Sequence, residues 1–143
     1  MPFEDGLETL DAKRTVLYLC LLASEITLKA LLEKAGVPLS NIKARWHNLS
    51  ALLGDVATCK VEEQIGIQTQ LVPAARLRGE IVDPKYSDAT VGKLLEAESC
   101  GASVYPNKIR YGECLAHYPP ETVLKMATVI NAWAKKYWER IHA

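Results

Sequence analysis

Arg110 and His117 are the residues whose types and spacing best suit chemistry on a phosphate ester. Six residues separate them, and Tyr111 follows the arginine directly. An arginine holds a phosphate through two parallel hydrogen bonds, and a histidine moves a proton near neutral pH. Together they suit cleavage of RNA without a metal, in which a base activates the 2′-hydroxyl and a cation stabilises charge on the phosphate. The structural alternative is that Arg110 pairs with an acid such as Glu113 and that Tyr111 packs in the core.

A second segment, around Lys43, Arg45 and His47, is cationic and contains Trp46. We expect it to lie at the start of a short helix, where backbone amides also favour anions. A phosphate of RNA or of a nucleotide fits this chemistry. The structural alternative is that Trp46 plugs the end of a helical bundle and that His47 hydrogen-bonds a backbone carbonyl.

The sequence contains no motif that is typical of a metal centre, a phosphate-binding loop or a redox site. The three histidines are far apart, without an HxxxH or HExxH pair, so we expect no metal centre. Neither GxGxxG nor GxxxxGK[ST] occurs, which argues against a phosphate-binding loop. The four cysteines are widely spaced without a CxxC pair, which argues against a zinc ribbon or a redox motif. We therefore expect no cofactor.

The composition is that of an ordinary globular domain. The 143 residues are 49% hydrophobic and 24% charged, which predicts one compact domain over residues 1–143. The 17 basic residues balance the 17 acidic ones, which argues against a globally basic nucleic-acid binder. The amino terminus lacks a basic signal region, and the longest apolar run, residues 16–23, is far shorter than the ~20 residues that span a bilayer. We expect a cytoplasmic protein with reduced thiols and no membrane association.

Hydrophobic periodicity predicts a long helix from about residue 6 to residue 35. Leucines recur there at alternating steps of three and four residues, which makes one apolar stripe. Gly36 and Pro38 should end this helix. Glu25 and Lys29 are four residues apart in the favourable order, which suits an exposed edge.

Four further segments are expected to be helical. A second helix should follow Asn48 as its N-cap, and a third helical piece is expected over residues 62–71. A short helix over 89–98 should follow, and a last helix should begin at Pro119–Pro120 with an apolar stripe that reaches Ile141. The chain is therefore expected to be all-α, an up-and-down bundle of four to five helices.

The apolar surface predicts a homodimer. The first helix is apolar on two sides, and Trp133, Tyr137 and Trp138 cluster near the end of the last helix. Trp and Tyr are enriched in protein interfaces, so we expect that end of the last helix to lie in the dimer contact.

Three short motifs, in this order, resemble the HEPN family of helical domains. LKALLEKAGV at residues 28–37 is similar to the "LKALL…G" end of the family's first helix. HNLSALL at 47–53 is similar to the "H-D/N-L-x-x-L-L" of its second helix, and IRY at 109–111 resembles the "x-R-Y" before its last helix. The resemblance covers most of the chain except residues 62–104, which are a divergent or inserted middle.

The resemblance implies an antiparallel up-and-down core, often in a homodimer. The family includes metal-independent RNases of toxin–antitoxin and defence systems, and non-catalytic members that bind nucleotides or small nucleotidyltransferases. The RNase members carry Arg, four to six residues and then His, a spacing that Arg110 and His117 match. Gly112 interrupts this pair and Pro119–Pro120 places the helix start after it, which favours the non-catalytic branch.

We therefore expect a non-catalytic HEPN-like module that binds RNA, a nucleotide or a nucleotidyltransferase partner, in a toxin–antitoxin or defence context. The expected binding residues are Lys43, Arg45, His47, Arg110 and Tyr111. The first alternative is a metal-independent endoribonuclease with Arg110 as phosphate clamp and His117 as general acid or base. The second alternative is a helical protein-interaction module.

Overall fold

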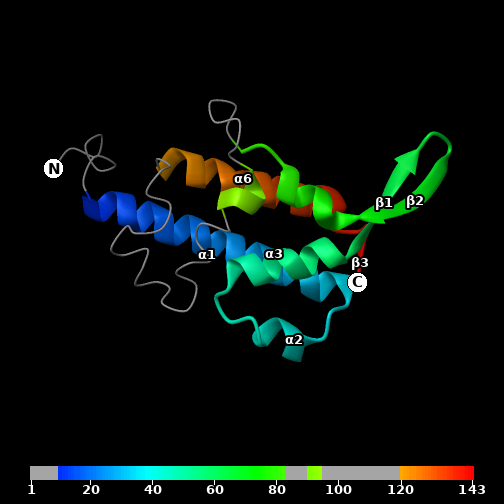
Figure 1. The fold of residues 1–143 in the computed structure, drawn as a ribbon, viewed down its shortest axis with the longest axis horizontal. Helices are drawn as coiled ribbons and strands as arrows, with labels where there is room; N and C mark the ends of the chain where they lie inside the picture. Colours follow the sequence, from blue (N-terminus) through cyan, green and yellow to red (C-terminus); the bar gives the residue numbers. More distant parts are fainter. Residues whose placement is uncertain (1–9, 83–89, 95–119) are drawn as a thin grey trace.

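The computed structural model describes residues 10–82, 90–94 and 120–143. Two long helices, α1 (Leu10–Ala35) and α6 (Pro120–Tyr137), lie side by side, and α3 (Leu49–Thr58) packs against α1 (Figure 1). The three helices run in the same direction, so their carboxyl ends meet at a small sheet (Figure 1). The antiparallel order expected for an up-and-down bundle is therefore wrong for these three helices.

The carboxyl end of α1 follows its sequence signal. Gly36 has a φ of +99°, a left-handed conformation that a residue with a Cβ rarely adopts. Its N–H donates to the Glu33 carbonyl at 3.1 Å, and the N–H of Val37 donates to the Leu32 carbonyl at 3.0 Å. This pair of bonds is a Schellman motif, which satisfies carbonyls that the end of the helix leaves without partners.

Helix α3 also begins where the sequence predicts. The side chain of Asn48 accepts a hydrogen bond from the backbone N–H of Ala51 at 3.0 Å, which confirms it as the N-cap. The apolar residues at helical spacing face the core, as expected: Leu49, Leu52, Leu53 and Val56 are all buried.

A three-stranded antiparallel sheet replaces the helix expected over residues 62–71. Strands β1 (Lys60–Ile65) and β2 (Gln68–Pro73) form a hairpin, and β3 (Ile141–His142) pairs with the start of β1, in the order β2-β1-β3. Gly66 turns the hairpin with a φ of +65°, at the position where a type II′ turn requires glycine. The expectation of an all-α chain is thus wrong, although most of the described residues are helical.

The regions before and after the hairpin differ in part from expectation. A short helix, α2 (Leu39–Lys43), lies between α1 and α3, where no helix was expected, and a 3₁₀ helix, η2 (Ala74–Gly79), follows β2. A helical turn covers residues 91–94, within the helix expected over 89–98, and both Val91 and Leu94 are buried there. Helix α6 begins at Pro120 as predicted but ends at Tyr137, so Ile141 reaches the core from β3 rather than from the helix.

The core joins α1, α3, α6, η2 and the base of the sheet. Its largest fully buried side chains are Leu21, Leu28, Leu31, Leu32, Leu49, Leu52, Leu77, Leu94, Met126 and Ile130. Cys20 and Cys59 are buried as free thiols. Among the described helices, none combines the length and the hydropathy that a membrane span needs.

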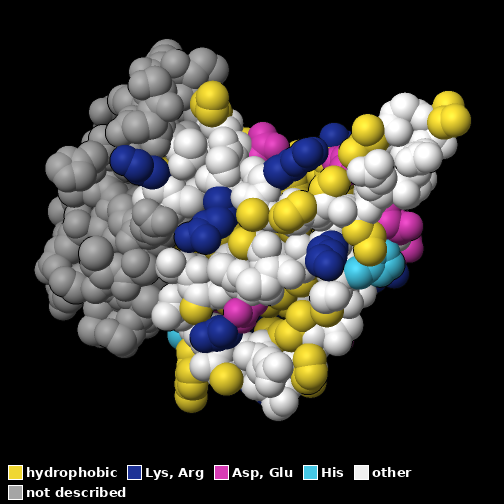
Figure 2. All heavy atoms as spheres, turned by 45° about the vertical axis from the view of Figure 1, so that its right-hand side comes forward, with side chains coloured by type: hydrophobic (Ala, Val, Ile, Leu, Met, Phe, Trp, Pro, Cys, Tyr) yellow, Lys and Arg dark blue, Asp and Glu magenta, His cyan; other side chains and the backbone are white. Residues whose placement is uncertain are grey.

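Basic side chains surround the end where the three helices meet the sheet. Lys34 lies in the last turn of α1, Lys135 and Lys136 in the last turn of α6, and Lys60 at the start of β1. Figure 2, turned toward this end, shows Lys and Arg side chains interspersed with Asp, Glu and His side chains. Cations stabilise helix carboxyl ends because the backbone dipoles leave partial negative charge there.

Tyr137 ties the end of α6 to the hairpin. Its hydroxyl donates a hydrogen bond to the Glu63 carboxylate on β1. Arg76 of η2 lies 4.0 Å from the same carboxylate oxygen. Burial, and then the hydrogen bond to Glu63, raise the pKa of Tyr137 above its usual value.

The raised pKa of Tyr137 predicts a loss of stability in alkali. The folded state favours the neutral phenol, so this contribution is complete below the unfolded pKa and is lost as the pH rises through the folded one. Urea unfolding followed by circular dichroism between about pH 8 and 11 should show a steeper decline for the wild type than for Tyr137→Phe. Parallel declines of the two proteins would contradict the assignment.

Candidate functional site

A buried carboxylate on α1 fixes the connection between α2 and α3. Glu25 is only 5% exposed, and its Oε1 lies 2.9 Å from Nδ1 of His47. Because a carboxylate only accepts hydrogen bonds, this contact places a proton on Nδ1. Lys29 donates to the other oxygen of Glu25 at 3.2 Å.

The expectation that Glu25 lies on an exposed edge is therefore wrong. Glu25 stands one helical turn from both Leu21 and Leu28, which are fully buried, so it shares their face of α1. Its two basic partners compensate the burial of its charge. His47 bonds this carboxylate, whereas the structural alternative from the sequence gave it a backbone carbonyl.

Arg45, in the same connection, is bound by a carboxylate of α3. Its Nε and Nη2 each lie 2.8 Å from an oxygen of Asp55, in the fork geometry of a bidentate pair. The hydrogen bond to Asp55 and its charge raise the pKa of Arg45. About half of the arginine side chain remains exposed, so the guanidinium is oriented without being enclosed.

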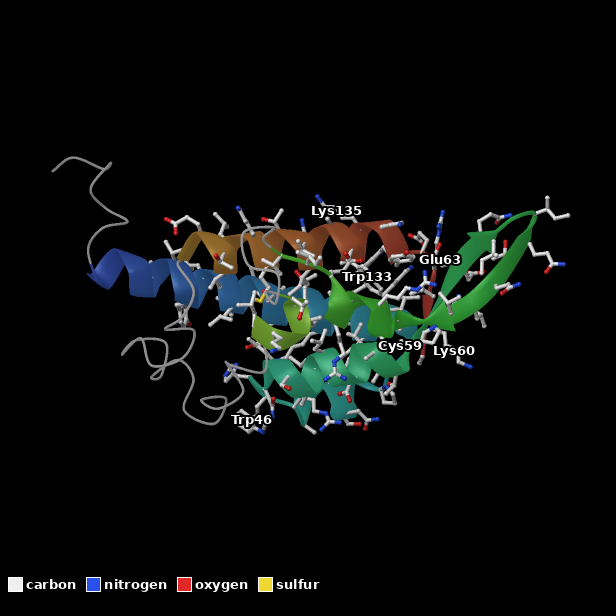
Figure 3. The ribbon with its side chains drawn as sticks, turned by 45° about the horizontal axis from the view of Figure 1, so that its top comes forward. Trp46, Cys59, Lys60, Glu63, Trp133 and Lys135 are labelled. Carbon is white, nitrogen blue, oxygen red and sulfur yellow. The ribbon has the colours of Figure 1, made fainter. Side chains whose placement is uncertain are left out.

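Trp46 lies between these two anchored residues and projects into solvent. It is 73% exposed, so the alternative in which it plugs the bundle end is wrong (Figure 3). Its φ is +50°, a left-handed conformation in which a bulky side chain is strained by about 1–3 kcal/mol. The N–H of Asn48 donates to the Arg45 carbonyl at 2.9 Å and closes a tight turn around Trp46. The anchors on either side hold this turn.

Three of the expected binding residues thus share one short connection. Lys43 ends α2 and is exposed, while Ile42 beside it is buried and attaches α2 to the core. Arg45 and His47 follow within four residues. Lys29, Lys43 and Arg45 stand against Glu25 and Asp55, which leaves one excess positive charge among these five side chains. The other expected site residues, Arg110, Tyr111 and His117, lie outside the described residues.

Two surface grooves flank α6 away from this connection. One, of about 420 Å³, lies between α1 and α6 and includes Ile26 and Trp138; the other, of about 310 Å³, lies along α6 beside Glu80. Trp133 and Tyr137 pack against each other inside the chain, with ring centroids 4.6 Å apart. Of the three aromatic residues expected in a dimer contact, only Trp138 therefore reaches the surface to an appreciable extent.

Residues 10–82, 90–94 and 120–143 contain no group of three His, Cys, Asp or Glu side chains that could hold a metal ion. Sequence reasoning missed Glu25, Asp55 and the exposure of Trp46. The position of Glu25 within the apolar stripe of α1 was the one signal that could have identified it.

Comparisons of the chain with protein-family models, with curated proteins and with solved structures find no match. The interpretation of the site therefore depends on its own geometry. The resemblance to HEPN domains stays a prediction from three short motifs.

Proposed function

We propose that this chain is a HEPN-like helical module that binds single-stranded RNA or nucleotides, without cleaving them, at the connection between α2 and α3. The observation that carries the proposal is Trp46, an exposed indole in a strained turn directly after the cationic Arg45 and three residues after Lys43. Exposed aromatic rings provide stacking surfaces for unpaired bases, and neighbouring cations follow the phosphates. The anchored Arg45 and the exposed Lys43 supply such cations here.

Strain at Trp46 supports a role in binding. A glycine would adopt the same backbone conformation without a steric penalty, so the tryptophan costs stability at this position. Because its ring is exposed, Trp46 gains little stabilisation from contacts with the core. Backbone strain of this kind clusters at ligand sites, where the surrounding structure maintains it.

Two of the three motifs that resemble HEPN domains contact each other. The segments 28–37 and 47–53 lie on α1 and at the start of α3, and their leucines share one core. The bond from His47 to Glu25 joins α1 to the start of the second motif. The common direction of α1, α3 and α6 departs from the antiparallel core that the family implies, so the proposal depends on the site more than on the fold.

Replacing Trp46 with glycine is the most direct test of binding. Loss of one base-stacking contact is expected to cost about 1–3 kcal/mol, which is roughly a 5- to 150-fold weaker affinity. Fluorescence anisotropy with a labelled single-stranded RNA in EDTA measures this change. Trp46→Phe should keep part of the affinity because it keeps a ring, and Trp138→Ala serves as the control for losing a different, partly exposed tryptophan.

The stability of the same variants distinguishes binding from folding. Trp46→Gly should unfold at the same or a higher urea concentration than the wild type, since it relieves the left-handed strain. Equal RNA affinity of Trp46→Gly and the wild type would contradict the proposed site. Cleavage of the RNA in EDTA, abolished by His117→Ala, would support the endoribonuclease alternative instead.

A further inference from the structure

The hairpin of β1 and β2 projects beyond the helices (Figure 1). Only its base contacts β3, because the register pairs β3 with Lys60 and Val61 alone. In the described part of the chain, no strand pairs with the outer edge of β2. Ile67 at the turn is 97% exposed, and Leu71 on β2 is 56% exposed. A projecting edge with exposed apolar residues is a ready template for pairing with another strand.

The hydrogen bonds of β1 fix which residues of β2 face outward. The N–H of Glu62 donates to the Arg140 carbonyl at 3.0 Å, on the side of β3. Alternation along an antiparallel strand then directs the backbone groups of Val61 and Glu63 toward β2, where Val72 and Gln70 are their partners. The backbone N–H and C=O groups of Thr69 and Leu71 consequently point away from the hairpin.

Apart from Pro73 at its last position, strand β2 carries none of the usual protections of an exposed edge. Its sequence is QTQLVP, without a charged residue, and its single proline stands at the last position. Lysine, inward-pointing charges or a central proline normally prevent such an edge from pairing with another copy of itself. The neighbouring strand β1 has three charged residues in six, so the absence of charge is specific to the open edge.

We propose that β2 pairs with β2 of a second copy of this chain, antiparallel, about a twofold axis at Gln70. Thr69 then lies opposite Leu71 of the second copy, and the reciprocal pair forms on the other side of the axis. Each of these pairs exchanges two N–H···O=C bonds, because these are the residues whose backbone groups face outward. The two small sheets join into one continuous sheet of six strands.

The proposed register explains why the strand that pairs with β2 is the same strand of a second copy. It matches uncharged residues along the whole pairing, with Gln70 opposite Gln70 at the axis. The two Leu71 side chains lie diagonally on one face, within reach of each other, so the dimer covers apolar surface that is exposed in the single chain. The contact involves neither Trp138 nor the groove between α1 and α6, and it is independent of the RNA site at Trp46.

Placing two like charges at the axis tests this register. Side chains directly opposite each other in such a pair have Cβ atoms about 4.5–5.5 Å apart, so two like charges at position 70 repel. Light scattering should give twice the chain mass of 15.8 kDa for the wild type and a single chain mass for Gln70→Lys and for Gln70→Glu alone. An equimolar mixture of the two variants should restore the doubled mass.

Gln68→Lys is the matched control. It places the same charge on the same strand and face, but opposite Val72 of the second copy and about 14 Å from its own counterpart along the strand. It should therefore dimerise like the wild type. Amide hydrogen exchange should show protection at Thr69 and Leu71 in the wild type and lose it in Gln70→Lys. A wild type of single chain mass, or a Gln70→Lys variant of doubled mass, would overturn the proposal.

Discussion

Replacing Trp133 with alanine is expected to lower the free energy of unfolding by about 3–5 kcal/mol, in the range of large-to-small changes of aromatic core residues. Trp133 of α6 is 6% exposed and packs its ring against that of Tyr137, one turn further along the same helix (Figure 3). Truncation removes this ring contact and leaves a cavity that its rigid neighbours fill only in part. Urea unfolding monitored by circular dichroism measures the loss.

Trp138→Ala is the matched control for this change. Trp138 lies one residue beyond the end of α6 and is 37% exposed, so its truncation should cost much less. The pair of variants also tests the dimer contact that the sequence predicts. The contrary result is that Trp133→Ala lowers the mass measured in solution from that of a dimer to that of one chain, with an unchanged free energy of unfolding. In that case Trp133 would be an interface residue, and its assignment to the core would be wrong.

Replacing Glu25 with alanine is expected to have the second largest effect, a loss of about 1.5–3 kcal/mol in the free energy of unfolding. The carboxylate bonds both His47 and Lys29, and both partners are partly exposed, so water compensates some of the loss. The connection that carries Trp46 loses its attachment to α1. RNA affinity should therefore fall together with stability.

Glu33→Ala removes the same charge from an exposed position of α1. It should leave both the free energy of unfolding and the RNA affinity nearly unchanged. Urea unfolding and the anisotropy assay can be applied to the two variants in parallel. If Glu25→Ala kept the full RNA affinity although it lowered the stability, His47 would not position the binding connection.

Three helix boundaries were the best predicted parts of the fold, because their signals are local. Gly36 ends α1 by its conformational freedom, and Asn48 starts α3 with its own side chain. Pro120 starts α6 at a position where its missing N–H costs nothing. Each of these signals requires only residues within one turn of the helix.

The hairpin could not be predicted from periodicity because it has almost no buried face. A strand is identified by apolar residues that alternate with polar ones, and this pattern arises when one face contacts the core. Strand β2 has no buried residue, and of β1 only Val61 is buried. The turn glycine, Gly66, was the remaining signal, and it lowered the helix propensity of the segment without indicating two strands.

The candidate site was predicted in its residues but not in its geometry. Lys43, Arg45 and His47 are close in sequence, so their proximity follows directly. The partner of His47 is 22 residues away on α1, and no local pattern indicates that pairing. Nothing in the sequence marks Trp46 for a left-handed turn, since bulky residues avoid it; its conformation is imposed by neighbours that are fixed on both sides.

The pairing of β3 with β1 has a consequence for how the chain folds. Glu62 and His142 are joined across 80 residues, and the N–H of Ala143 reaches the Ala35 carbonyl at the end of α1. The hairpin and the ends of α1 and α3 need only local contacts, whereas this junction carries the loop-closure entropy of most of the chain. We therefore expect β3 to join the sheet only after the segment that follows α6 has been synthesised, so that the three-stranded sheet is completed late in folding.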